Sequence, residues 1–247
     1  MKTNLFHSLG IAFISSSYTA YYCLLASWKY LTGTINRVWV DATIQLWSSK
    51  LLKIIKADYV IFNPHHVQPL SHRPTIVMCN HSSLYDIPLS FKAFPDSSMR
   101  MLAKKELSKV PFMGKGMVAA EFPFIDRKNR HQAIQDLQKV KSLMQDGIIM
   151  WIAPEGTRSK DGQLGSFKKG AFITAIQANA TIIPIGIRGA SEILPARTFS
   201  YSLRQKPEVH IGEPIDASEY TMETKDALIQ RTHTVMQALI SGDTHSN

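Results

Sequence analysis

The sequence is poor in cysteine. Its 247 residues include only Cys23 and Cys79, and these two lie in segments of very different character. Two cysteines so placed do not form a disulfide framework or a cysteine-based zinc site. We therefore expect a reducing, cytoplasmic setting and no metal site.

Two catalytic motifs are also missing from the chain. There is no G-x-S-x-G run, the turn that presents a serine nucleophile in many hydrolases. There is no H-E-x-x-H run, the helical motif that binds zinc in metalloproteases. These absences weigh against a serine hydrolase and a metal hydrolase.

Acidic residues are fewer than basic ones. The chain has 19 Asp and Glu against 28 Lys and Arg, so its formal net charge is +9. Such an excess favours an anionic partner, which could be a phosphorylated substrate, a nucleic acid or an acidic membrane surface. The alternation of aromatic and basic residues expected in a groove for single-stranded nucleic acid is absent, so we expect no nucleic-acid partner.

Charge is absent altogether from residues 3–28. As a helix these residues would be about 39 Å long, which is enough to span a bilayer. Their serines and tyrosines equally fit a shallow or re-entrant segment, because tyrosine favours the headgroup region. A secretory signal is the third possibility, and it is disfavoured because no convincing small-residue cleavage site precedes Trp28 and Lys29.

An amphipathic helix is predicted between residues 34 and 57. Its apolar positions recur at spacings of four, three, four and three: Val40, Ile44, Trp47, Leu51 and Ile54. A membrane-surface helix and a helix packed on a core share this pattern. Beside the uncharged segment, we interpret residues 1–57 as a membrane-associating helical pair. The positive residues within 29–56 would keep the following domain on the cytoplasmic side, at the inner membrane in a bacterium.

Residues 58–247 are predicted to form one α/β domain. Short apolar runs predict strands at 59–62, 75–79, 99–103, 122–125, 148–153 and 182–187. Helices are expected at 130–146, 170–179 and about 218–240. This alternation indicates a largely parallel mixed sheet flanked by helices.

A candidate catalytic pair follows the predicted strand 75–79. His81 precedes Asp86 by five residues, an offset that separates two side chains on a regular helix or strand. The pair can meet only across a turn, which Ser82 and Ser83 could supply with Asp86 as the N-cap of the next helix. An imidazole held by a carboxylate can act as a general base. The alternative is a strand end and a helix cap without chemistry.

Three other strand ends carry distinctive runs. Phe124-Ile125-Asp126-Arg127 ends in a charge pair, which could also be a surface ion pair. In Pro154-Glu155-Gly156-Thr157-Arg158-Ser159, the glycine permits close backbone approach and the arginine offers a planar fork for phosphate. In the run 182–187, Pro184 predicts an edge strand or a bulge, or it could shape the wall of an acyl pocket.

In order and interval, the runs at 80–86, 124–127, 154–159 and 183–187 resemble the four blocks of the glycerolipid acyltransferase family. The resemblance is to the 1-acylglycerol-3-phosphate acyltransferases of the bacterial PlsC type. It implies that His81 removes a proton from the acceptor hydroxyl and that Asp86 orients it. It also implies an acceptor site with these residues: Lys104 (the weakest match), Arg127, Glu155, Gly156, Thr157 and Arg158. The fourth block is associated with the acyl donor.

The resemblance further implies a reaction. A fatty acyl group would pass from acyl-CoA or acyl carrier protein to the sn-2 hydroxyl of lysophosphatidic acid. The product would be phosphatidic acid, made for phospholipid biosynthesis without a cofactor. Glycerol 3-phosphate or another lyso-lipid is the alternative acceptor, and a non-catalytic membrane adaptor is the alternative of a different class.

Overall fold

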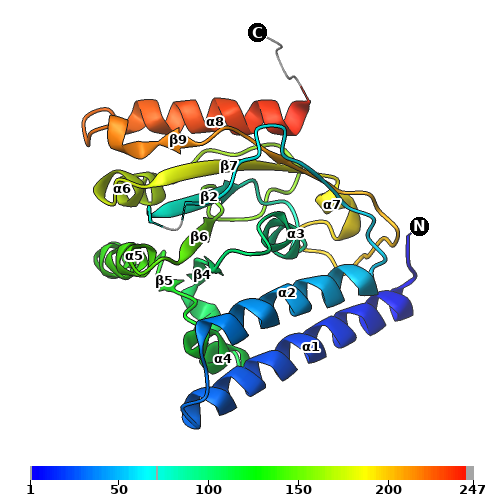
Figure 1. Cartoon of the computed structure of the whole chain (residues 1–247). Helices are drawn as coiled ribbons and strands as arrows, with labels where there is room; N and C mark the ends of the chain where they lie inside the picture. The colour runs from blue at the N-terminus through cyan, green and yellow to red at the C-terminus, as the bar shows by residue number, and fades with distance from the viewer. Residues whose placement is uncertain (1, 71, 243–247) are drawn as a thin grey trace.

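The computed structural model describes residues 2–70 and 72–242 of the chain. Two long helices come first, α1 (Leu5–Leu31) and α2 (Arg37–Ile54), and they lie side by side along one side of the molecule (Figure 1). Each begins at an asparagine whose side chain accepts a hydrogen bond from a backbone N–H three residues on: Asn4 from His7 and Asn36 from Trp39. The predicted helical pair is therefore present.

The main sheet has seven strands. They are β1 (Val60–Phe62), β2 (Thr75–Cys79), β3 (Met99–Met101), β6 (Ile149–Ile152), β7 (Thr181–Arg188), β8 (Glu208–Ile211) and β9 (Ile215–Asp216). The order is β1-β8-β7-β2-β6-β3, with β9 also beside β7. Only the pairs that β7 makes with β8 and β9 are antiparallel. The predicted largely parallel mixed sheet is confirmed.

A second, two-stranded sheet begins directly after β3. It consists of β4 (Ala103–Lys104) and β5 (Phe124–Ile125), which are parallel and pair Lys104 with Ile125. The predicted strand 99–103 is thus divided at Leu102 between the two sheets. Between β4 and β5 lie the 3₁₀ helix η1 (Lys105–Lys109) and the short helix α4 (Met113–Ala119).

Helices cover both faces of the main sheet. They are α3 (Asp86–Ala93), α5 (Arg130–Gln145), α6 (Lys169–Gln177), α7 (Ala190–Ile193) and α8 (Lys225–Ser241), with the 3₁₀ helix η2 (Ala217–Glu219). The molecule has two clusters of buried apolar side chains, and alternate side chains of β2 point into one or the other. Val77 and Cys79 pack toward α2 and α3, whereas Ile76 and Met78 pack toward α5, α6 and α8. Helices α5 and α6 agree with the sequence prediction. The helix predicted at about 218–240 begins only at Lys225, and α7, β8 and β9 were not predicted.

Pro184 lies in the interior of the sheet, so the prediction of an edge strand is wrong. The alternative of a bulge agrees with the register, because two residues of β7, 183 and 184, lie opposite three residues, 212–214, between β8 and β9. β7 pairs with β2 on one side and with β8 and β9 on the other. The Pro184 carbonyl accepts a hydrogen bond from Gly212, which lies between β8 and β9. The proline therefore occupies a point where the antiparallel partner is interrupted, and its missing N–H costs the sheet little.

The apolar stripe of α2 packs on the core. Leu51 is buried, and Ile44, Trp47 and Ile54 lie against the same core cluster, with the Trp47 ring 6.4 Å from that of Phe91 in α3. Of the two readings of this stripe, packing on the core is the one that the structure supports. In the described part of the chain, α1 is the one helix long and apolar enough to cross a membrane, with a mean hydropathy of 1.3.

Candidate active site

The turn after β2 brings His81 and Asp86 together. Nδ1 of His81 lies 2.9 Å from Oδ2 of Asp86. The same carboxylate oxygen accepts hydrogen bonds from the backbone N–H groups of Ser82 at 2.7 Å and Ser83 at 2.8 Å. Asp86 is the first residue of α3 and Tyr85 is the N-cap, so the prediction that Asp86 caps this helix is wrong. Its side chain closes the preceding turn.

The imidazole is fixed on one side and open on the other. Asp86 is fully buried, whereas 15% of the His81 side chain is exposed. The ring meets that of Trp151 edge to face, with 5.7 Å between the centroids. No hydrogen-bond partner for Nε2 occurs among the described residues. Such a ring, oriented by a carboxylate and open at its second nitrogen, suits a general base.

Glu155 joins the 154–159 loop to the histidine. One carboxylate oxygen accepts from the backbone N–H of His81 at 2.9 Å and the other from that of Gly165 at 3.0 Å. The N–H of Ser159 in turn donates to the His81 carbonyl at 2.7 Å. Glu155 is 6% exposed, and burial raises its pKa. The resemblance implied that Glu155 lines the acceptor site, and in the structure both of its carboxylate oxygens accept hydrogen bonds from backbone amides.

Arg127 contacts the same loop at Gly156. Its Nη1 donates a hydrogen bond to the Gly156 carbonyl. Gly156 has φ +74°, where a side chain would be strained, and an added Cβ would lie 3.4 Å from Cγ of Lys168. The neighbouring Asp126 pairs with Lys105 at 2.9 Å and not with Arg127. Arg127, which follows β5, therefore contacts the 154–159 loop.

Three further predicted residues have unpaired side chains. Lys104 and Thr157 are exposed, Arg158 is half-buried, and none of the three side chains has a hydrogen bond or ion pair within residues 2–70 and 72–242. Lys104 is opposite Ile125 in the small sheet, two residues before Arg127. The small sheet thus places Lys104 and Arg127 near each other in register. Neither Lys104 nor Arg158 forms an ion pair with a carboxylate among the described residues.

Asn80, for which no role was predicted from the sequence, lies next to His81 at the end of β2. Its side-chain amide accepts from the N–H of Ile187 at 2.7 Å and donates to the carbonyl of the same residue at 2.9 Å. The run 80–86 is thereby fixed to the end of β7. An asparagine directly after a buried strand was the available signal, but its partner is 107 residues away.

Within residues 2–70 and 72–242 there is no group of three or more His, Cys, Asp and Glu residues that could hold a metal ion.

A family model described as Acyltransferase matches residues 61–188, the stretch that contains all four runs. The chain belongs to this acyltransferase family. The family resemblance noted in the sequence is therefore confirmed.

Individual relatives agree with the family model. The chain is 34% identical to an uncharacterized acyltransferase of Schizosaccharomyces pombe over 70% of its own length and 62% of the relative's. It is 30% identical to the 1-acyl-sn-glycerol-3-phosphate acyltransferase alpha of Mus musculus, over 66% and 57%. It is also 30% identical to the chloroplastic 1-acyl-sn-glycerol-3-phosphate acyltransferase of Arabidopsis thaliana, over 61% and 42%. It thus spans less than two thirds of the length of these curated relatives.

A solved structure covers nearly the whole chain. The crystal structure of the 1-acyl-sn-glycerophosphate acyltransferase PlsC from Thermotoga maritima superposes with a TM-score of 0.79 at 25% sequence identity. The match covers 99% of this chain and 97% of that one. The α/β fold and the preceding helices therefore have a counterpart in a solved acyltransferase.

Proposed function

We propose that this chain transfers a fatty acyl group from a thioester to the sn-2 hydroxyl of lysophosphatidic acid. The product would be phosphatidic acid, and the donor acyl-CoA or acyl carrier protein. The observation that carries the proposal is the His81 ring, which is held by Asp86 at Nδ1 and open at Nε2. It is connected through Glu155 to a loop that bears the unpaired Arg158. Relatives named as 1-acyl-sn-glycerol-3-phosphate acyltransferases support the choice of acceptor.

In the proposed reaction, Nε2 of His81 takes the proton of the acceptor hydroxyl as its oxygen attacks the thioester carbonyl. A C–O bond forms, and the tetrahedral intermediate then collapses with cleavage of the C–S bond. The imidazolium returns the proton to the departing thiolate. Asp86 stabilises the positive charge on the ring, and its two backbone donors fix its own position. Because the donor is already activated, no covalent enzyme intermediate is required.

The phosphate of the acceptor would be bound by the cationic side chains around the loop. Arg158 and Lys104 form no ion pair within the described chain, and Arg127 already reaches Gly156. Arginine can bind a phosphate through two parallel hydrogen bonds. Gly156, having no side chain, would let the acceptor approach the backbone, and Thr157 offers an exposed hydroxyl.

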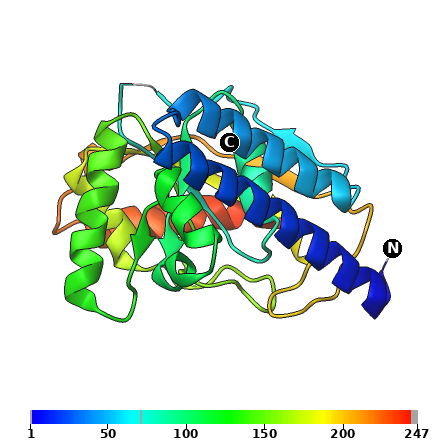
Figure 2. The same ribbon diagram turned by 90° about the horizontal axis from the view of Figure 1, so that it is seen from below.

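The same proposal places the chain on a membrane, with the catalytic domain on the cytoplasmic side. The large apolar residues of α1 are exposed along most of its length: Leu5, Phe6, Leu9, Phe13, Ile14, Tyr21, Leu24, Trp28, Tyr30 and Leu31. Figure 2 shows this helix at the front of the view from below, with no other helix or strand in front of it. A face of this kind suits insertion into the headgroup region, where the acceptor lipid resides.

The test is an acyl-transfer assay with the purified full chain. Wild type and His81→Ala receive a labelled acyl donor with lysophosphatidic acid and, in parallel, with glycerol 3-phosphate. His131→Ala, a change at an exposed histidine of α5, is the matched control. We expect phosphatidic acid from wild type and the control, and about 10²–10⁴-fold less from His81→Ala.

Each other outcome has a defined meaning. Histidine-dependent product from glycerol 3-phosphate alone would reassign the acceptor. Absence of any product with either acceptor and both donor types would favour the membrane adaptor. Near-normal turnover by a folded His81→Ala enzyme would overturn the role of the histidine.

A further inference from the structure

The segment between β4 and β5 ends in an exposed apolar tip. Val110 is 41% exposed, Phe112 60% and Val118 59%. Lys109, Pro111 and Lys115 around them are exposed as well. Most apolar side chains of this size are buried in a folded protein, so three of them on one short segment call for a partner.

Phe112 combines this exposure with an unusual backbone. Its φ is +63° and its ψ −42°, a positive-φ conformation that a bulky side chain rarely adopts. It is the N-cap residue of α4, and its side chain makes no capping hydrogen bond. A strained aromatic residue whose ring is largely in solvent gains little from packing inside the protein. Strain of this kind is most often retained for a function outside the fold.

The tip is continuous with the apolar face of α1. α4 packs directly on α1, because an added Cβ at Gly116 would collide with the backbone of Cys23 (Figure 1). On α1, residues on both sides of this contact expose large apolar side chains, among them Phe13 and Leu24. The exposed apolar residues of the two segments therefore lie on neighbouring elements in direct contact.

The charges around the tip indicate which partner this is. The side chains of Lys109 and Lys115 are exposed and have no ion pair in the described part of the chain. Lysines beside an apolar tip match a lipid surface, where apolar side chains enter the acyl boundary and ammonium groups meet anionic headgroups.

We propose that residues 108–118 insert Val110, Phe112 and Val118 into the bilayer on which α1 rests, as a second membrane contact. The inference rests on the proposed function and extends it. Lys104, a proposed phosphate ligand, is the last residue of β4 and lies six residues before Val110. Insertion of the tip would hold this lysine at the depth of the phospholipid headgroups, where the acceptor phosphate lies.

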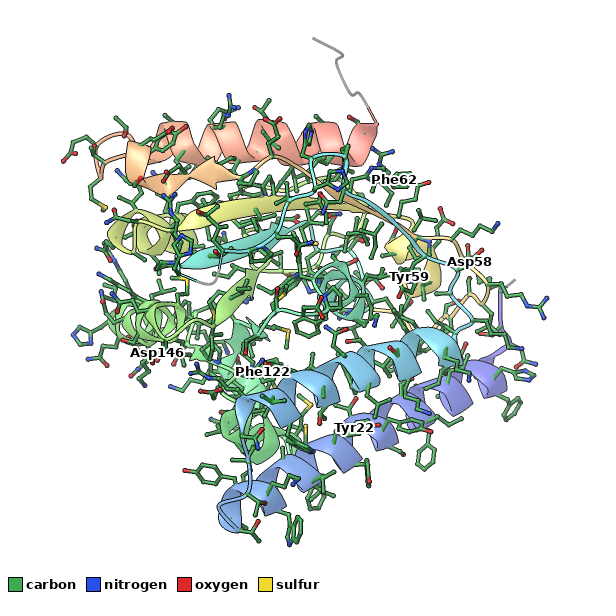
Figure 3. The ribbon with its side chains drawn as sticks, viewed as in Figure 1. Tyr22, Asp58, Tyr59, Phe62, Phe122 and Asp146 are labelled. Atoms are coloured by element: carbon green, nitrogen blue, oxygen red, sulfur yellow. The ribbon has the colours of Figure 1, made fainter. Side chains whose placement is uncertain are left out.

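The first test measures the environment of single positions. Cys79 is fully buried, so a Cys23→Ala background leaves one reactive thiol when a surface residue is changed to cysteine. Phe112→Cys, Phe13→Cys on α1 and Phe62→Cys on β1 are labelled with a polarity-sensitive fluorophore. Phe62 lies far from α1 and α4 and serves as the control (Figure 3). The vesicles contain phosphatidylcholine with or without phosphatidylglycerol.

We expect a blue shift at positions 112 and 13 with vesicles, larger when phosphatidylglycerol is present, and none at position 62. A shift at 13 with none at 112 would overturn the inference and leave membrane docking by α1 intact. No shift at either position, with acyl transfer still measurable, would remove both the inference and the membrane part of the proposed function.

A second test separates a membrane role from a structural one. Phe112→Gly removes the ring and relieves the positive-φ strain, so the variant should unfold at a higher temperature than wild type. Its affinity for the anionic vesicles should nevertheless fall about tenfold, because a Phe side chain no longer leaves water. A lower unfolding temperature with unchanged vesicle affinity would show that Phe112 serves the fold instead.

Discussion

The carboxylate of Glu155 accepts a hydrogen bond from the backbone N–H of His81 across a distance of 2.9 Å, between residues 74 positions apart in the chain. Its other oxygen accepts from Gly165. Glu155 therefore fixes the position of the His81 backbone relative to the 154–159 loop, and it makes no hydrogen bond to the imidazole. Acyl transfer by a general base requires such placement, because a small displacement of the base lowers the rate strongly.

Glu155→Gln should lower kcat about tenfold and change KM for lysophosphatidic acid little. The amide can accept only through its oxygen, so one of the two buried N–H donors loses its acceptor. This loss costs about 1–3 kcal/mol of stability. Steady-state kinetics and denaturant unfolding measure the two effects. Glu223→Gln, at an exposed glutamate, is the control, and wild-type kcat in Glu155→Gln would contradict the positioning role.

Asp86→Asn should reduce kcat about 10²–10⁴-fold while the protein remains folded. The asparagine no longer offers a charged acceptor to Nδ1 of His81, so the imidazole loses its fixed tautomer and its counter-charge. Residues that act as one unit are not additive. The double variant His81→Ala/Asp86→Asn should therefore be no slower than His81→Ala alone. A rate equal to the product of the two single effects would show that the residues act independently.

The local part of the site could be predicted from the sequence. A contiguous apolar run gave β2, and the five-residue offset from His81 to Asp86 required the turn that the structure has. Helices α5 and α6 lie within a few residues of their predicted ranges because their apolar periodicity and end signals are local. Local patterns of this kind depend on residues within one element.

The remaining parts depend on distant partners. Asn80 pairs with Ile187, and the buried Arg100 pairs with Asp41, 59 residues away. β8 has only four residues, with alternate burial, which is too short for a reliable period. The stripe of α2 fits a membrane or a core equally well, and only the position of α3 decides between them. Contacts between residues so far apart in the chain cannot be predicted from the pattern of any one segment.

Arg158→Ala should lower kcat/KM for lysophosphatidic acid about 10–100-fold, the loss of one strong charge-assisted contact. Monoacylglycerol, which lacks the phosphate, should be used equally well by wild type and variant. Because Arg158 has no ion pair in the described chain, stability should change little. Arg231→Ala, on α8 and away from the loop, is the control. An equal loss with both acceptors would argue against phosphate binding by Arg158.

Asp41→Ala should destabilise the protein more than the double variant Asp41→Ala/Arg100→Met. Arg100 is fully buried, and its Nη1 lies 2.6 Å from Oδ1 of Asp41 on α2. Removing the carboxylate leaves a buried cation with only Glu121 nearby, at 3.8 Å, and costs about 2–4 kcal/mol. The double variant removes the cation as well. Denaturant unfolding is measured for Asp41→Ala, Arg100→Met and the double variant. If the loss of stability in the double variant equalled the sum of the two single losses, this account would be contradicted.

Asp216→Asn should lower stability at neutral pH by about 1 kcal/mol, and the difference from wild type should disappear in acid. The Arg73 guanidinium donates to the Asp216 carboxylate and holds its pKa well below the usual range. A carboxylate with a depressed pKa in the folded state stabilises the fold above its ordinary pKa of about 4, and this contribution is lost as the pH falls further. Unfolding free energies measured from neutral to acidic pH test this. Asp96→Asn, at an exposed aspartate without an ion pair, should show no such trend. A constant difference between wild type and Asp216→Asn at all pH values would exclude the ion pair as its cause.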